Sequence, residues 1–437
     1  MNERIIIAVF FFCLPFLGNA QIPAPGYSSG LNVLLLNATA HLGNGKLIDK
    51  SAIAFKDGII TKVEDASKFD QSIEVFDTVI DLTDNHIYPG IIAPNSTLGL
   101  FEIGAVRATK DFREVGSINP NVRSIIAYNT DSRITPTVRS NGVLLAQITP
   151  RGGLVSGTSS VVELDAWNWE DAVCKLDDGI HINWPVTRGG SSIWKKGGDK
   201  NTKRTSLNIA RLHSLFSKAR AYSQLTKHKE FDVKMESMRG LFSAKQSLFI
   251  HVNKAEGIAE ALSFGKEYGI EKIVLVGVAE GWLVLDLIKE SGASVMLKRL
   301  HSLPTKMDED IDLPYRLPKL FLDAGILYCL ENSGDMEAMG TRNLPFYAGT
   351  AAAYGLTKEE ALMSITSNTA KILGLENRLG SLEVGKDATL FVSRGDALDM
   401  LTNHVVLAYV RGRQIDLNNP QKSLYRKFRK KYRDISN

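Results

Sequence analysis

The middle of the chain alternates short, wholly apolar segments with amphipathic ones. The run SLFIHV at residues 247–252 predicts a buried strand, and the helix expected after it extends to about Tyr268, with Gly269 as its stop. The run KIVLVGV at residues 272–278 repeats the strand pattern. Strands that are apolar along their whole length are typical of a parallel sheet covered by helices.

Further units of this kind extend the pattern on both sides. Residues 91–93 and the segment GVLLAQITP predict two more strands, and Thr357 with Glu360 forms the capping box of a helix that Gly374 would end. We therefore predict an α/β fold with a (β/α)8 TIM-like barrel over residues 91–376. A doubly wound sheet is the alternative, although no Gly-rich nucleotide fingerprint follows a strand.

β-like segments flank this central region at both ends. Residues 31–89 hold several short apolar strands and the pair Asp57-Gly58, a strong hairpin turn signal. Near the other end, the segments GSLEVGKDATLFV and NHVVLAYVRGRQIDL show the same pattern of short apolar strands broken by turns. We predict one small β-sandwich domain built from residues 21–90 and 377–420.

The first twenty residues follow a different pattern. Arg4 precedes an apolar run from Ile5 to Leu17, and small residues follow at Gly18-Asn19-Ala20. This pattern predicts a signal peptide over residues 1–20, cleaved near Ala20-Gln21, and therefore a secreted or periplasmic protein. An uncleaved anchor is the alternative. No later segment is long and apolar enough to cross a bilayer, so we expect no transmembrane segment in the mature chain.

Composition adds one local feature to an ordinary globular chain of 437 residues with a formal net charge of +4. The segment KSLYRKFRKKYR, residues 422–433, carries seven Lys or Arg together with three aromatic residues. We expect residues 421–437 to form a basic helix docked on its own domain, with the charged face in solvent. We therefore expect no nucleic-acid partner. The alternative interpretation is that this helix binds nucleic acid or the surface of an anionic membrane.

Several stretches resemble the amidohydrolase superfamily, in particular its imidazolonepropionase-like metal-dependent members. The segment YPGIIAPNST is similar to the family's first barrel strand, and FIHVNKAEGIAEAL to a strand that carries a metal-binding His. Residues 341–392 resemble the family's last strand region, its following helices and the return into the sheet domain. The resemblance implies a divalent metal at the barrel mouth, and zinc is the metal expected. The metal would activate water for attack on a C–N bond.

The resemblance also assigns metal ligands by position. Asn95 and Thr97 stand where the family has its two first-strand His, so this motif is degenerate. His251 matches a later metal-binding His, and His181 is a candidate ligand from a middle strand. The structural alternatives are that residues 95–97 only cap the strand, and that the two His form internal hydrogen bonds.

Two acidic residues compete for the role of the family's proton-shuttling carboxylate. Asp335 is our candidate both for this catalytic role and as a metal ligand, and Glu331 is its rival. A plain loop Asp is the alternative. Arg151 and the pair Arg342-Asn343 lie near predicted strand ends and are candidates for substrate binding, because Arg binds carboxylates in bidentate fashion. A surface ion pair is the alternative for each Arg.

Two functions follow from these observations. The first is an exported amidohydrolase-like enzyme that uses metal-assisted hydrolysis on a C–N bond of a small amide, cyclic amide or dipeptide. The second is a catalytically inactive homologue, with no metal, that acts as a binding or assembly partner. The degenerate first strand favours the second, and His251 with the acidic loop favours the first. Whether the chain forms a homo-oligomer or pairs with a paralogue stays open.

Overall fold

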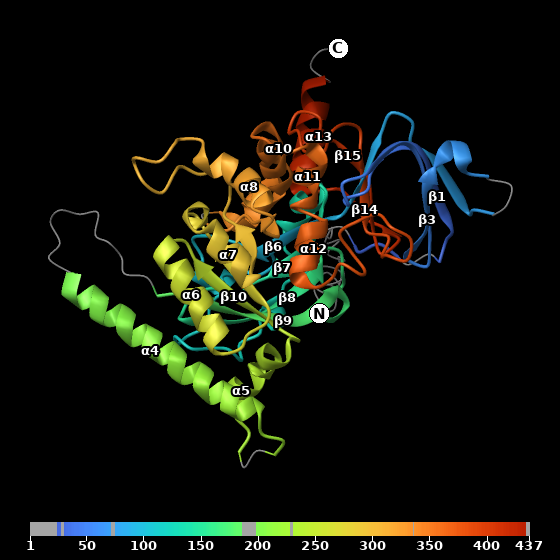
Figure 1. Ribbon diagram of the computed structural model, residues 1–437. Coiled ribbons are helices and arrows are strands. Elements are labelled where there is room, and N and C mark those ends of the chain that lie inside the picture. Colours follow the sequence, from blue (N-terminus) through green and yellow to red (C-terminus); the bar gives the residue numbers. More distant parts are fainter. Residues whose placement is uncertain are drawn as a thin grey trace, which may run out of the picture.

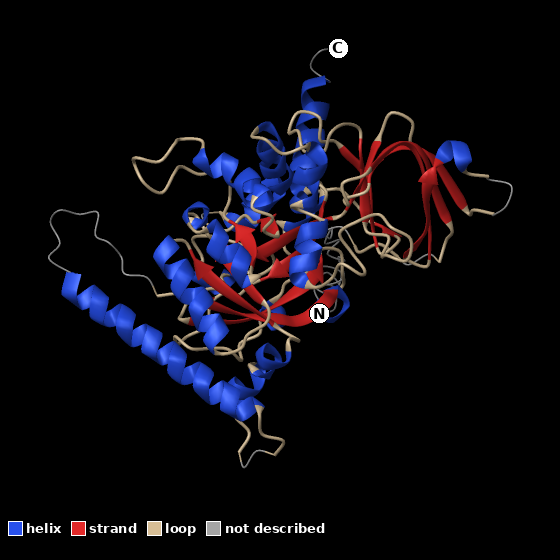
Figure 2. Cartoon of the chain, viewed as in Figure 1, coloured by secondary structure: helices blue, strands red, loops and turns tan. Residues whose placement is uncertain are grey.

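The computed structural model describes residues 24–27, 30–70, 75–185, 198–227, 230–334 and 336–433 (Figure 1). The predicted signal peptide with its cleavage point, and Asp335, lie outside the described residues. Within the described part, the chain forms a central barrel sheet surrounded by helices and a second sheet beside it (Figure 2). The predicted α/β class is therefore confirmed.

The barrel is an eight-stranded sheet whose strands follow one another in chain order. Its members are β6 (Ile91–Ser96), β7 (Val143–Ile148), β8 (Val155–Glu163), β9 (Val173–Asn183), β10 (Ser247–Val252), β11 (Ile273–Gly277), β12 (Ser294–Leu297) and β13 (Tyr328–Leu330). The edge strands β6 and β13 do not pair with each other, but both are hydrogen-bonded to the segment at residues 364–365. Leu330 N–H donates to the Ser364 carbonyl, and Ile92 N–H donates to the Ile365 carbonyl. The barrel is thus nearly closed.

All neighbouring barrel strands are parallel except at β8, which runs antiparallel to both β7 and β9. An all-parallel (β/α)8 arrangement was therefore wrong at this strand. The reason is the short connection from β7 to β8, residues 149–154, in which Gly152 and Gly153 have φ of 87° and 70°. A parallel pair needs a crossover of a dozen or more residues, so this connection can only fold the chain back on itself.

Helices cover the outside of the barrel, and their ends follow local sequence signals. The Thr357–Glu360 capping box is present, but the single helix predicted after it is divided in two. The predicted helix after β10 is also found, and Glu280 caps it from another element, accepting a hydrogen bond from Ala255 N–H (3.1 Å). The α-helices are α2 (Thr135–Arg139), α3 (Trp169–Ala172), α4 (Gly198–Ser223), α5 (Val233–Ser237), α6 (Ala255–Glu267), α7 (Leu285–Ser291), α8 (Leu313–Asp323), α9 (Glu337–Gly340), α10 (Leu344–Ala353), α11 (Lys358–Met363), α12 (Ser367–Leu373) and α13 (Pro420–Arg433).

The second sheet combines strands from both ends of the chain. Asp57 and Gly58, with φ of 50° and 82°, form the predicted hairpin turn between β2 and β3. A partly buried ion pair between Arg413 and Glu163 (2.7 Å) joins this sheet to the barrel. Its strands are β1 (Val33–His41), β2 (Leu47–Lys56), β3 (Ile59–Asp65), β4 (Thr78–Asp81), β5 (His86–Pro89), β14 (Leu390–Ser393), β15 (Val405–Val410) and β16 (Arg413–Gln414).

The C-terminal helix α13 departs from the sequence prediction. From Ser423 to Tyr432 every side chain is exposed, so the helix does not dock along its own domain. In Figure 1 it rises away from the other elements toward the C-terminus. In the described part of the chain, no helix has the length and apolar character needed to span a membrane.

Candidate functional site

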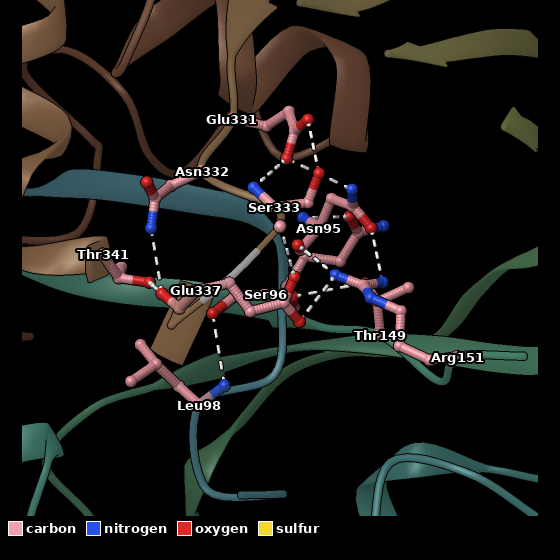
Figure 3. Close-up of polar contacts among 12 residues, drawn as sticks. Asn95, Ser96, Leu98, Thr149, Arg151, Glu331, Asn332, Ser333, Glu337 and Thr341 are labelled. Carbon is pink, nitrogen blue, oxygen red and sulfur yellow. Dashed lines mark hydrogen bonds and ion pairs between the residues drawn. The ribbon is translucent and has the colours of Figure 1, made fainter. Parts of the chain in front are cut away.

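Asn95 is the centre of a polar network at the end of β6. It is 1% exposed and has a φ of 49°, a left-handed conformation that Asn tolerates better than most residues. Arg151 donates from Nη1 to Asn95 Oδ1 and from Nη2 to the Asn95 carbonyl, both at 2.6 Å (Figure 3). Asn95 Nδ2 donates to Glu331 Oε2 (3.3 Å), and its backbone N–H donates to Gln147 Oε1 (3.0 Å). Asn95 therefore connects three other barrel segments.

Glu331 follows β13 directly and is completely buried. Its carboxylate accepts hydrogen bonds from Ser333, from the backbone N–H and from Oγ, and also faces the Asn95 amide (Figure 3). Burial raises the pKa of Glu331 to about 7, although the Ser333 hydrogen bonds and the Arg151 charge act in the opposite direction. A carboxyl group with such a pKa can exchange a proton near neutral pH, as catalytic acids and bases do.

A cavity of about 270 Å³ opens beside Arg151. Its polar lining includes the Arg151 guanidinium and Glu337, which form an ion pair with an N–O distance of 3.3 Å. Its apolar lining includes Phe101, Phe112 and Met336, and its remaining residues are Thr97, Gly334 and Ala338. The cavity thus combines an apolar wall with one positive and one negative group.

The network continues from Gln147 into the barrel interior. Gln147 Nε2 donates to Asp178 Oδ2 (2.7 Å) and to Ser159 Oγ (3.2 Å), and Ser159 Oγ donates to Asp178 Oδ1 (2.7 Å). Burial raises the pKa of Asp178 to about 6 despite these hydrogen bonds. Asp178 is therefore a second buried carboxyl group that loses its proton at a higher pH than an exposed Asp does.

Two imidazoles complete the chain of hydrogen bonds. His181 Nε2 contacts Ser159 Oγ (2.9 Å), and His181 Nδ1 contacts His251 Nε2 (3.0 Å). His181 also stacks on Phe249, with ring centroids 4.4 Å apart. Burial, together with the Arg151 charge, lowers the pKa of both His side chains, so both are neutral at neutral pH. The fold thus brings the two His predicted from sequence into direct contact.

The other predicted site residues lie elsewhere. The Arg342 carbonyl accepts a hydrogen bond from Asn141 Nδ2 (2.9 Å), which places its backbone beside the turn that enters β7, at the opposite end of that strand from Arg151. Asn343 lies beside Tyr347, whose hydroxyl donates to Asn332 Oδ1 (2.7 Å). Asp335 lies outside the described residues, whereas its rival Glu331 lies in the network.

The sequence prediction missed four members of the site, Gln147, Ser159, Asp178 and Glu337. The first three are polar residues within strands, each at most 2% exposed, and only Gln147 lies in an otherwise apolar strand. For Gln147, a single polar residue inside an apolar strand was the available signal, because buried polar groups need internal partners. Ser159 and Asp178 had no such signal, because their strands hold several other polar residues. Glu337 had no such signal, since its position depends on the loop after β13.

Comparisons with known proteins agree with this architecture. A profile of the Amidohydrolase family matches residues 322–415. Amidohydrolase tasK of Hapsidospora irregularis is 24% identical over 366 residues, which make up 74% of this chain and 36% of that protein. The imidazolonepropionase of Syntrophobacter fumaroxidans (strain DSM 10017 / MPOB) is 39% identical over 66 residues, 15% of this chain and 16% of that protein. The chain therefore spans well under half the length of either curated relative.

A solved structure extends the likeness to the whole fold. The crystal structure of an amidohydrolase from Thermotoga maritima MSB8 superposes with a TM-score of 0.75 at 24% identity, covering 87% of this chain and 99% of that one. The α/β barrel with an adjoining sheet is therefore the fold that this chain shares with that structure. Over residues 322–415 the chain matches the Amidohydrolase family profile, and in fold and curated relatives it resembles the amidohydrolase superfamily.

Members of this superfamily typically depend on a metal, but the residues present here do not fit one. Arg151, a permanent cation, contacts Asn95 where the resemblance places a ligand, and Asn95 and Thr97 offer neutral oxygens in place of imidazoles. Both ring nitrogens of His181 have partners within the protein. In the described ranges, no three His, Cys, Asp or Glu side chains gather so that they could hold a metal ion.

Proposed function

We propose that this chain is a metal-independent member of the superfamily that binds a small ligand in the cavity at the barrel mouth. The observation that carries this proposal is the Arg151 guanidinium on Asn95, because a fixed positive charge there replaces the cation that the family would hold. This role corresponds to the second of the two functions considered from sequence, a binding member without a catalytic metal.

The lining of the cavity defines the ligand chemistry. Arg151 suits a carboxylate and Glu337 suits an ammonium group, while Phe101 and Phe112 suit an apolar side chain. A zwitterionic molecule of the size of an amino acid or small dipeptide combines these features. On binding, the molecule would break the Arg151–Glu337 ion pair. Its carboxylate would then pair with Arg151 and its ammonium group with Glu337.

Calorimetric titration tests this proposal with an apolar dipeptide and two analogues, one with the carboxylate converted to an amide and one with the amine acetylated. We expect the dipeptide to bind without added metal, the amide to lose most of the affinity, and Phe112→Ser to weaken binding of the dipeptide. The matched control, Phe69→Ser, changes an aromatic residue packed against the second sheet and should leave binding unchanged. Binding that requires zinc, or tight zinc retained through purification in mass spectrometry, would contradict the proposal.

A second candidate function, hydrolysis of a C–N bond, is favoured by one observation. Glu331 follows the last barrel strand and has a pKa raised to about 7, as a general base requires. Glu331→Gln separates the two candidates, because it would abolish release of amino acids from a dipeptide but leave dipeptide binding nearly intact. Hydrolysis that survives this substitution would exclude Glu331 as the base.

We further propose that the protein is exported, as the pattern of its first twenty residues suggests. Fractionation of cells that express the chain, followed by sequencing of the N-terminus, tests this. A mature protein that begins at Gln21 outside the cytoplasm is expected, and an intact N-terminus in the cytoplasm would contradict it.

A further inference from the structure

The first turn of helix α13 is held by hydrogen bonds, whereas the side chains beyond it are exposed to solvent. Asn419 caps the helix by accepting a hydrogen bond from Lys422 N–H, and its Nδ2 donates to Ser140 Oγ (3.0 Å). Thr137 Oγ1 donates to Gln421 Oε1 (2.8 Å), so α2 holds the first turn. Beyond that turn, exposed side chains surround the helix on every face.

The exposed residues of α13 are segregated by chemistry. At about 100° per residue, Leu424, Tyr425, Phe428 and Tyr432 fall within one arc of about 100°. Each of the four is between 48% and 64% exposed. The basic residues occupy the rest of the circumference, and no Asp or Glu occurs between Pro420 and Arg433. Helix α13 is therefore amphipathic, with an apolar stripe that is largely exposed to solvent.

Charge is concentrated on this helix. The whole chain has a net charge of +4 and residues 422–433 hold seven basic residues, so removing those seven charges from +4 leaves −3 for the remainder. A helix of 14 residues is marginal in water, and helices of this length normally gain their stability by packing an apolar face. The concentration of charge together with the exposed stripe indicates a partner that is both apolar and anionic.

We propose that α13 binds the surface of a membrane that contains anionic lipids. Lying in the interface, the helix would bury Leu424 and Phe428 among the acyl chains and place its Lys and Arg side chains against the headgroup phosphates. A lipid surface accounts for both faces of the helix. Nucleic acid would use only the basic face, and a second copy of α13 on the stripe would bring two sets of seven cations together.

The binding can be measured by sedimentation with phosphatidylcholine vesicles, either pure or containing phosphatidylglycerol. The protein should begin at Gln21, so that the apolar run at residues 5–17 cannot contribute. We expect binding only to the anionic vesicles, and loss of that binding at about 1 M salt, where the screening length falls to about 3 Å.

Two variants and one control separate the contributions of the two faces. Lys427→Gln with Lys430→Gln and Lys431→Gln should weaken partitioning on the order of 100-fold, since each basic residue near the surface contributes about 1 kcal/mol, or roughly fivefold. Leu424→Ser with Phe428→Ser should abolish sedimentation at unchanged charge. The control removes three exposed basic residues of α4, Lys203, Arg204 and Lys218, and should bind like the unaltered protein.

Four results would overturn the proposal. The first is equal binding to both vesicle types, and the second is an equal loss of binding in the α4 control. The third is a dimer in analytical ultracentrifugation that the Leu424 and Phe428 substitutions dissociate. The fourth is displacement of the protein from vesicles by a short nucleic acid duplex at physiological salt. Because all the substituted positions are exposed, an unchanged midpoint of thermal unfolding is expected in every variant.

Discussion

Arg151 holds Asn95 by two hydrogen bonds of 2.6 Å, one to the side-chain oxygen and one to the backbone oxygen. The contact joins the end of β6 to the loop after β7 and fixes Asn95 in a left-handed conformation. It also puts a positive charge where the resemblance implies a metal ligand. The same contact therefore stabilises the barrel mouth and determines which chemistry is available there.

Replacing Arg151 tests the structural part of this conclusion. Arg151→Ala should lower the free energy of unfolding by about 3 kcal/mol, because it removes two charge-assisted hydrogen bonds and leaves two buried oxygens of Asn95 without partners. Denaturant titration measures the change. Arg239→Ala, which removes an exposed ion pair with Glu236, is the matched control and should cost less than about 1 kcal/mol. Equal effects of the two substitutions would mean that the Arg151–Asn95 contact carries no special stability.

The raised pKa of Glu331 predicts a pH dependence of stability. Because the folded-state pKa of about 7 lies above the ordinary value of 4.5, folding favours the protonated form. The resulting stabilisation is fully present below about pH 4.5 and is lost as the pH rises through 7, a change of about 3 kcal/mol. Glu331→Gln should remove it.

The free energy of unfolding of both proteins between pH 4 and 8 checks this prediction. Asp178 acts with the same sign, whereas His181 and His251, whose pKa values are lowered, destabilise the fold as the pH falls below about 6.5. All three groups are present in the variant, so the difference between the two profiles isolates Glu331. Parallel profiles would show that Glu331 titrates alike in the folded and unfolded chain.

Gly142 reports on the contact between the barrel and the second sheet. Its φ is 88°, and an added Cβ would lie 2.6 Å from the Phe391 ring. We expect Gly142→Ala to cost about 3 kcal/mol of unfolding free energy, from backbone strain and overpacking together. Gly385→Ala is the control, since its φ is also 88° but no atom lies within 4 Å of the added Cβ, so it should cost about 1 kcal/mol. If thermal unfolding gave similar costs for the two substitutions, the Phe391 ring would be able to move aside for the added Cβ.

The candidate site was predicted in part from the sequence. Asn95 and His251 were identified through the family resemblance, His181 as a candidate ligand from a middle strand and Arg151 by its place near a strand end. All four lie in or beside one network. The partners that determine their chemistry were not identified, because Gln147, Ser159 and Asp178 meet only when β7, β8 and β9 lie side by side. That β8 runs antiparallel was also missed, although the short connection before it was visible in the sequence.

The sequence by itself determined the elements and their class. Apolar periodicity, the Thr357–Glu360 capping box and the Asp57-Gly58 turn are local signals, and a strand or helix forms largely from such signals. Only the tertiary structure decided what the mouth of the barrel contains. The charge of Arg151, the neutral His pair and the raised pKa of Glu331 depend on distances and burial among residues far apart in the chain. Desolvation and hydrogen bonding act through space, and no spacing along the sequence encodes them.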